Sequence, residues 1–199
     1  MKGLLYKDFK SILHSISPAY LMCLIPIIVY IGKNMFLYVI AIIIGLLLGT
    51  QVLITISIDE RVKLNYYYRV IPLSYYTIAI EKYVFSFLLS LFSAAIVLLI
   101  TFCYNREFSF LYPFIGAYIV ITYDIIMIPS SLYFGTEKGR YILMLFAVLP
   151  IFMAKFNDII LKLLSTFSNG LIALVVFLHL IMLLISYAIS VKSIRRYIA

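Results

Sequence analysis

Long apolar runs separated by short charged stretches constrain this chain more than any other feature. The longest runs cover residues 36–58, 83–104, 110–134 and 169–191. A helix rises about 1.5 Å per residue, so about 20 apolar residues cross the hydrocarbon core of a bilayer. Inside lipid every backbone polar group needs an internal partner, which a helix provides. With 65% hydrophobic residues and a mean hydropathy of +1.14, the sequence predicts an all-α integral membrane protein.

Two shorter apolar runs, at residues 18–32 and 141–154, raise the predicted number of transmembrane helices to six. Both are short for a full crossing, so they either tilt little, thin the bilayer or cross incompletely. A segment at 141–154 that only dips into the membrane is the alternative to a sixth crossing. We expect six crossings in a single domain over residues 1–199. Pro26, Pro113, Pro129 and Pro150 all lie in apolar runs, and each is expected to kink or end a helix where a neighbour can satisfy the carbonyl that it leaves free.

The basic residues predict the orientation of these spans, because cytoplasmic loops carry an excess of Lys and Arg. With both termini in the cytoplasm, 12 of the 16 basic residues lie inside and four lie outside. If residues 141–154 only dip in and return, the division becomes 11 against five, and six crossings keep the basic C-terminal tail inside. The net charge of +8 favours anionic lipid headgroups over nucleic acid as a partner, since the basic residues lie in short loops between apolar runs.

Two stretches outside the spans have the periodicity of amphipathic helices. In residues 1–17, Leu5, Phe9, Ile12, Leu13 and Ile16 share one helix face, and Lys and Ser residues occupy the other. This pattern predicts an interfacial helix that lies in the headgroup plane. The same pattern in residues 155–168 predicts a short external helix just before the last span. Packing of that second helix against neighbouring spans is an equally weighted alternative.

The sequence contains no pattern for catalysis or metal binding. It has no phosphate-binding loop and no zinc-protease motif, and its two histidines, His14 and His179, lie far apart. Cys23 and Cys103 both fall in apolar segments, where they are expected to act as small apolar side chains. We therefore predict that this chain is not an enzyme and that it holds no metal and no cofactor of its own.

Three residues within the spans are candidates for special roles. Asp124 is the one acid inside a predicted span, and burying a charge in lipid costs about 2.5–3.5 kcal/mol, so it should face the bundle interior. It is either a proton or substrate site on a translocation path or a hydrogen-bonded acid that helps the helices pack. Gly45 and Gly49 are four residues apart, a spacing that allows close helix packing, in a dimer seam or by coincidence.

A charged, tyrosine-rich island at residues 59–72 interrupts the apolar pattern with the sequence DERVKLNYYYRVIP. Asp59 and Glu60 suit the start of a helix, because carboxylates favour the positive end of the helix dipole. Arg61, Asn65 and Arg69 would form one polar line, and Pro72 would end the helix. We predict a short helix that docks a cytoplasmic partner, with a solvated loop as the alternative.

Three short motifs carry a family resemblance: the opening MKGLLYKDF, the stretch IPLSYYTIAIEKY and the loop FGTEKGRYI. They resemble the small ABC-2 type permeases of bacterial ABC exporters, including those found beside peptide exporters of the modulin type. The resemblance covers the whole chain in layout. It implies six spans in the bacterial cytoplasmic membrane, an amphipathic helix before the first span and an external helical piece before the last.

The resemblance also implies a role for the inner loops. Residues 59–72 would form a coupling helix seated in a cleft of a separate ATPase subunit, and residues 135–140 would make a second, smaller contact. ATP and Mg would bind to that ATPase and not to this chain. The residues assigned to ATPase coupling in this way are Asp59, Glu60, Arg61, Lys63, Asn65, Tyr66, Tyr67, Arg69, Glu137, Lys138 and Arg140.

The expected function is that of a permease subunit in an ATP-driven exporter of an amphipathic peptide, a lipid-like molecule or a drug. Its expected partners are a dimer of ABC ATPase subunits, a second permease copy or a sister permease, and membrane lipids. Two other functions stay open at this point. One is a stand-alone carrier driven by protons through Asp124, and the other is a structural membrane subunit that transports nothing.

Overall fold

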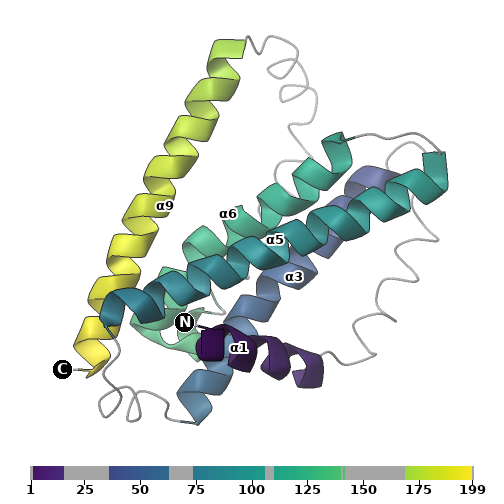
Figure 1. Ribbon diagram of the computed structural model, residues 1–199. Helices are drawn as coiled ribbons and strands as arrows, with labels where there is room; N and C mark the ends of the chain where they lie inside the picture. The colour runs from purple at the N-terminus through teal and green to yellow at the C-terminus, as the bar shows by residue number, and fades with distance from the viewer. Residues whose placement is uncertain are drawn as a thin grey trace.

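The structure, a computed structural model, describes residues 2–15, 36–62, 74–105, 110–139, 141 and 169–198. These residues form helices, with one further helical turn at 136–139, and no strand. The helices are α1 (Lys2–Ser15), α3 (Phe36–Arg61), α5 (Tyr75–Asn105), α6 (Leu111–Phe134) and α9 (Asn169–Ile198) (Figure 1).

Four of these helices are long and apolar enough to cross a membrane. The candidate spans are Leu37–Arg61, Tyr75–Tyr104, Leu111–Phe134 and Phe177–Arg196. They match the second, third, fourth and sixth predicted spans, which confirms an all-α membrane protein with helices at these four places. The predicted first and fifth spans, at 18–32 and 141–154, and the predicted external helix at 155–168 lie outside the described residues, apart from Tyr141.

The start of α5 differs from the prediction, because the helix begins at Tyr75 and not at residue 83. Ser74 supplies the reason. Its Oγ accepts the Thr77 backbone N–H at 3.2 Å and lies 2.7 Å from Thr77 Oγ1, so it caps the first turn of the helix. The earlier start moves Glu81 and Lys82 out of the predicted loop and into the second turn of α5.

Helix α6 lies at the centre of the bundle and packs against α3, α5 and α9 (Figure 1). The crossing of α3 and α6 is close because glycine occupies the contact. A Cβ on Gly45 would lie 2.8 Å from the Gly116 carbonyl oxygen, and a Cβ on Gly49 would lie 2.8 Å from Tyr123 Cδ1. Both glycines of the predicted packing pair therefore face another helix of the same chain.

Pro129 interrupts the hydrogen bonding of α6, and α9 compensates for it. A proline at this position leaves the Ile125 carbonyl without its helical donor. Ser186 of α9 donates its hydroxyl to that carbonyl at 2.5 Å. The prediction that a neighbouring helix satisfies the freed carbonyl is confirmed at Pro129. Because the Ser186 proton is used there, Tyr83 of α5 donates to Ser186 Oγ at 2.6 Å, which joins three helices. Pro26 and Pro150 lie outside the described residues.

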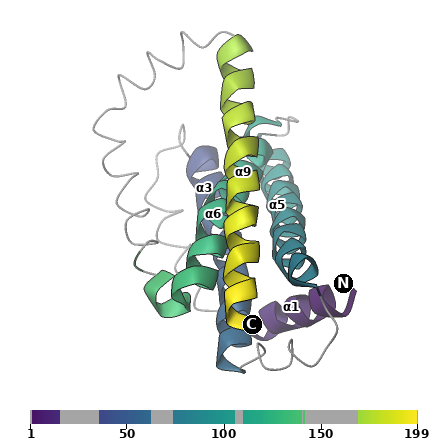
Figure 2. The ribbon, with the colours of Figure 1, turned by 90° about the vertical axis from the view of Figure 1, so that its left-hand side faces the viewer.

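Helix α1 lies across one end of the bundle, close to the last turns of α3 and α9 and the first turns of α5 (Figure 2). We call this the α1 end. The amphipathic helix predicted at 1–17 is present as α1, but its faces differ from the prediction. Ile12 is buried in the core with Val52 and Phe85, whereas Phe9 of the predicted apolar face is exposed and Asp8 is fully buried. The physical reason is that ion pairs, described below, satisfy the buried charge.

Candidate functional site

The end of α3 places two acids at the α1 end. The prediction that a new helix begins at Asp59 is wrong, because α3 runs without a break through Asp59 and Glu60 to Arg61. Both carboxylates therefore sit at the negative end of the helix dipole, where negative charge is unfavourable. Each is stabilised by groups from other helices, and those contacts build the site.

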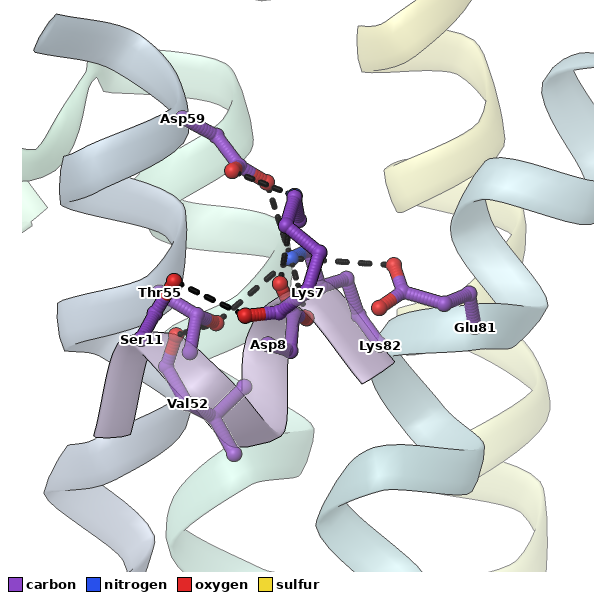
Figure 3. Close-up of polar contacts among 8 residues, drawn as sticks. All are labelled: Lys7, Asp8, Ser11, Val52, Thr55, Asp59, Glu81 and Lys82. Atoms are coloured by element: carbon purple, nitrogen blue, oxygen red, sulfur yellow. Dashed lines mark hydrogen bonds and ion pairs between the residues drawn. The ribbon is translucent and has the colours of Figure 1, made fainter. Parts of the chain in front are cut away.

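Asp59 belongs to a buried charge cluster that joins α1, α3 and α5 (Figure 3). The Lys82 ammonium lies 2.6 Å from Asp8 Oδ2, 2.9 Å from Asp59 Oδ2 and 3.6 Å from Glu81 Oε2. The Lys7 ammonium lies 2.5 Å from Asp59 Oδ1 and 3.1 Å from Asp8 Oδ1. We call these five residues the charge cluster. Its centre is buried, since the side chain of Lys82 is only 3% exposed.

The charge cluster keeps Asp8 ionised. Burial alone would raise the pKa of the Asp8 carboxyl, but the positive charges of Lys82 and Lys7 help to hold this pKa below its usual value. A depressed pKa means that the stability contributed by the Asp8 carboxylate is present at neutral pH. That contribution is lost only as the pH falls through the lowered value.

Glu60 joins α3 to the loop that follows α6. Its Oε2 accepts the Thr136 backbone N–H at 3.0 Å and the Thr136 hydroxyl at 2.6 Å. The chain reverses just before this contact at Gly135, whose φ of 85° is a conformation that suits glycine. The two segments that the sequence assigns to ATPase coupling, 59–72 and 135–140, are thus joined through Glu60 and Thr136.

The outer surface of this junction is polar and exposed. Arg61, Glu137 and Lys138 are exposed, and with Phe134 they line a pocket of about 330 Å³ beside Glu60. Of the residues assigned to ATPase coupling, the structure therefore brings Asp59, Glu60, Arg61, Glu137 and Lys138 to the same end. Lys63, Asn65, Tyr66, Tyr67, Arg69 and Arg140 lie outside the described residues.

Asp124 lies away from this end, among side chains of α5, α6 and α9. It is 1% exposed, which confirms that it faces the bundle interior. Ser86 donates its hydroxyl to Asp124 Oδ2 at 2.5 Å, while Oδ1 has no hydrogen-bond partner among the described residues. A cavity of about 60 Å³ adjoins it, with walls that include Tyr83 and Leu183. This space accommodates a water molecule and excludes a large cargo.

Sequence reasoning missed the charge cluster because it placed Lys82 in a loop and read Lys7 as solvated. One local signal was available for α5: Ser74 is a favoured N-cap residue, and a helix that starts after it includes Glu81 and Lys82. No local signal pairs Asp8 with Lys82, because 74 residues separate them in the chain.

The family described as "ABC-2 family transporter protein" matches this chain over residues 3–195. No curated protein and no solved structure was found to match the chain. The family match extends over the charge cluster, the Glu60–Thr136 contact and all four described spans except the last residue of the fourth, Arg196. A match of nearly the whole length shows that the chain belongs to the ABC-2 transporter family.

Proposed function

We propose that this chain is the membrane-spanning permease subunit of an ATP-driven exporter, and that a separate ABC ATPase dimer docks on its α1 end. Members of this family generally work with an ABC ATPase. ATP and Mg bind to that partner. The α1 end faces the cytoplasm of a bacterial cell, in keeping with the basic residues of α1, α3, α5 and α9 that gather there.

One observation carries this proposal: two adjacent acids at the end of α3, Asp59 and Glu60, connect α3 to α1, α5 and the segment after α6. Asp59 is paired with Lys7 of α1 and Lys82 of α5, and Glu60 is bonded to Thr136 after α6. A displacement of the end of α3 by the ATPase would therefore move α3, α5 and α6 together, since these ion pairs and hydrogen bonds join them. Coupling of this kind needs a stiff element with satisfied ends.

The rest of the transport cycle follows from this coupling. Two copies of the permease, or one copy and a sister chain, line a translocation path. Closure of the ATPase subunits on ATP changes the helix arrangement, and an amphipathic peptide, a lipid-like molecule or a drug leaves the cytoplasmic side or the inner leaflet. The apolar outer surfaces of α5 and α9 suit contact with lipid or with such a cargo.

The docking surface is tested by reversing its exposed positive charges. In the variant Arg61→Glu with Lys138→Glu, copurification with the ATPase is expected to fall about tenfold or more. A change of about 1.4 kcal/mol suffices for a tenfold effect, and like charges opposed across an interface cost more than this. The measurement is the ratio of ATPase to permease recovered in mild detergent.

The matched control is Lys10→Glu with Arg195→Glu, which reverses two other exposed charges near the α1 end. This variant is expected to keep its ATPase. Equal recovery of the ATPase with both variants and with the unchanged protein would refute docking at Arg61 and Lys138.

The competing carrier function is tested at Asp124. If this acid only supports packing, Asp124→Asn retains the Ser86 hydrogen bond and transport falls by no more than about fivefold, since a hydrogen bond to a charged group exceeds a neutral one by about 1 kcal/mol. The assay is ATP-dependent cargo efflux from vesicles that contain the permease and its ATPase. Efflux driven by a proton gradient without nucleotide, and abolished in Asp124→Asn, would favour the carrier instead.

A further inference from the structure

An apolar groove runs between α6 and α9 on the outside of the bundle. Its walls are α6 between Ile125 and Phe134 and α9 between Met182 and Ile189, and its volume is about 340 Å³. Met182, Ile185 and Tyr133 on these walls are each about half exposed, so the groove is open along its length. We call it the α6–α9 groove. It lies within two candidate spans, at the level where lipid acyl chains lie.

The stripe of α9 that faces the groove becomes basic toward the α1 end. Met182, Ile185, Ile189, Lys192 and Arg196 follow one another at intervals of three or four residues, so they share one face of the helix. The first three line the groove or its edge, and the last two are exposed beyond it. Arg196 lies about 10 Å farther along the helix axis than Ile189, at about 1.5 Å per residue.

Arg196 is placed at the mouth of the groove by a direct contact. Its guanidinium carbon lies 5.9 Å from the centre of the Tyr133 ring, and Tyr133 is part of the groove wall. Neither Lys192 nor Arg196 forms an ion pair with any described acid, whereas Lys7 and Lys82 do. Two cations without acidic partners among the described residues therefore lie near the position that the headgroup would take if an acyl chain filled the groove.

An apolar groove with basic residues at one end has the chemistry to bind a lipid with an anionic headgroup. We propose that the α6–α9 groove is a binding site for an anionic phospholipid of the cytoplasmic leaflet, with one acyl chain between the helices and the phosphate near Lys192 and Arg196. Basic sites between transmembrane helices on the cytoplasmic side bind anionic headgroups in this way. The inference concerns a resident lipid, and it holds whatever cargo the protein carries.

A second copy of the chain fits this face less well. A symmetric dimer brings the same surface of both copies together. Pairing through the groove would set Lys192 and Arg196 of one copy at the same membrane depth as those of the other, and like charges repel. A phospholipid supplies the negative charge that such a dimer lacks.

The absence of tryptophan from the sequence permits a sharp test. The variant Ile185→Trp places the single tryptophan of the protein in the groove. Leu184→Trp is the matched control, because Leu184 is exposed, does not line the groove and points about 100° away around the helix at nearly the same depth. Each variant is reconstituted in phosphatidylcholine vesicles that contain brominated phosphatidylglycerol or brominated phosphatidylcholine, and quenching of tryptophan fluorescence is measured.

The expected result is selective quenching in the groove. Brominated phosphatidylglycerol should quench Ile185→Trp with a relative affinity at least about fivefold above that of brominated phosphatidylcholine, while Leu184→Trp shows no preference. Adding Arg196→Gln to Ile185→Trp should lower the ratio of the two lipid affinities about fivefold. Arg195→Gln, one residue away on another face of the helix, should leave this ratio unchanged. Native mass spectrometry of the unchanged protein should likewise show a bound anionic phospholipid. The double variant Lys192→Gln with Arg196→Gln should lose it.

Two results would overturn the proposal. Equal quenching of Ile185→Trp by both brominated lipids would show that the groove does not select anionic headgroups. Weaker quenching of Ile185→Trp than of Leu184→Trp by either lipid would show that protein covers the groove. If Ile185→Trp does not insert, Met182→Trp reports on the same wall of the groove. Mass spectrometry of the double variant Lys192→Gln with Arg196→Gln tests the proposal without any change inside the groove.

Discussion

Replacing Lys82 with methionine is expected to lower the free energy of unfolding by about 3–5 kcal/mol, because removing one partner of a buried ion pair leaves the other charge uncompensated. Methionine keeps most of the apolar length of the lysine side chain, so the change is mainly in charge. It would leave the carboxylates of Asp8 and Asp59 with Lys7 as their one cation in the charge cluster, and Glu81 with none. Thermal or denaturant unfolding of the purified protein in mild detergent measures the loss.

Two further variants make this prediction specific. Lys10→Met removes an exposed lysine of α1 and is expected to change stability by less than about 0.5 kcal/mol. Adding Asp8→Asn to Lys82→Met should restore part of the lost stability, since one unpaired buried charge is then gone. Similar stability for Lys82→Met and Lys10→Met would mean that the charge cluster does not hold α1 on the bundle.

Gly45→Ala is expected to destabilise the protein by about 1–3 kcal/mol, the usual cost of overpacking a well-filled contact. The added Cβ would meet the Gly116 carbonyl oxygen at 2.8 Å and Ile119 Cβ at 3.0 Å. The first of these atoms is backbone, so α3 and α6 would have to move apart. The larger Gly45→Val should cost more and is measured in the same unfolding assay.

Gly3→Ala is the matched control, because a Cβ at Gly3 meets nothing within 4 Å and this glycine is also helical. Alanine favours a helix over glycine by about 0.8–1 kcal/mol, so the control should be neutral or more stable. A loss of stability at Gly45 is then steric and not a matter of helix propensity. A gain of stability at both positions would contradict the close crossing of α3 and α6.

Hydropathy predicted four of the spans well because a transmembrane helix satisfies its own backbone and is therefore a local property of the sequence. The bounds of α6 at Leu111–Phe134 differ by one residue from the predicted 110–134. The error at α5 was larger, since the prediction followed apolar residues and passed over the cap formed by Ser74 and Thr77. The error at Asp59 had a related cause: acids were taken as a helix start, whereas here tertiary partners hold them at a helix end.

The sequence alone determined that this chain is helical, that it belongs in a membrane and that Asp124 must turn inward, because each follows from the cost of exposing polar groups to lipid. Only the tertiary structure decided that Lys82 pairs with both Asp8 and Asp59 and that Glu60 accepts hydrogen bonds from Thr136. It also decided that Ser186 donates to the carbonyl that Pro129 leaves free. Those contacts join residues that lie from 23 to 76 positions apart. Helical periodicity shows which face of a helix is polar, but the choice of neighbour depends on how all the helices pack together.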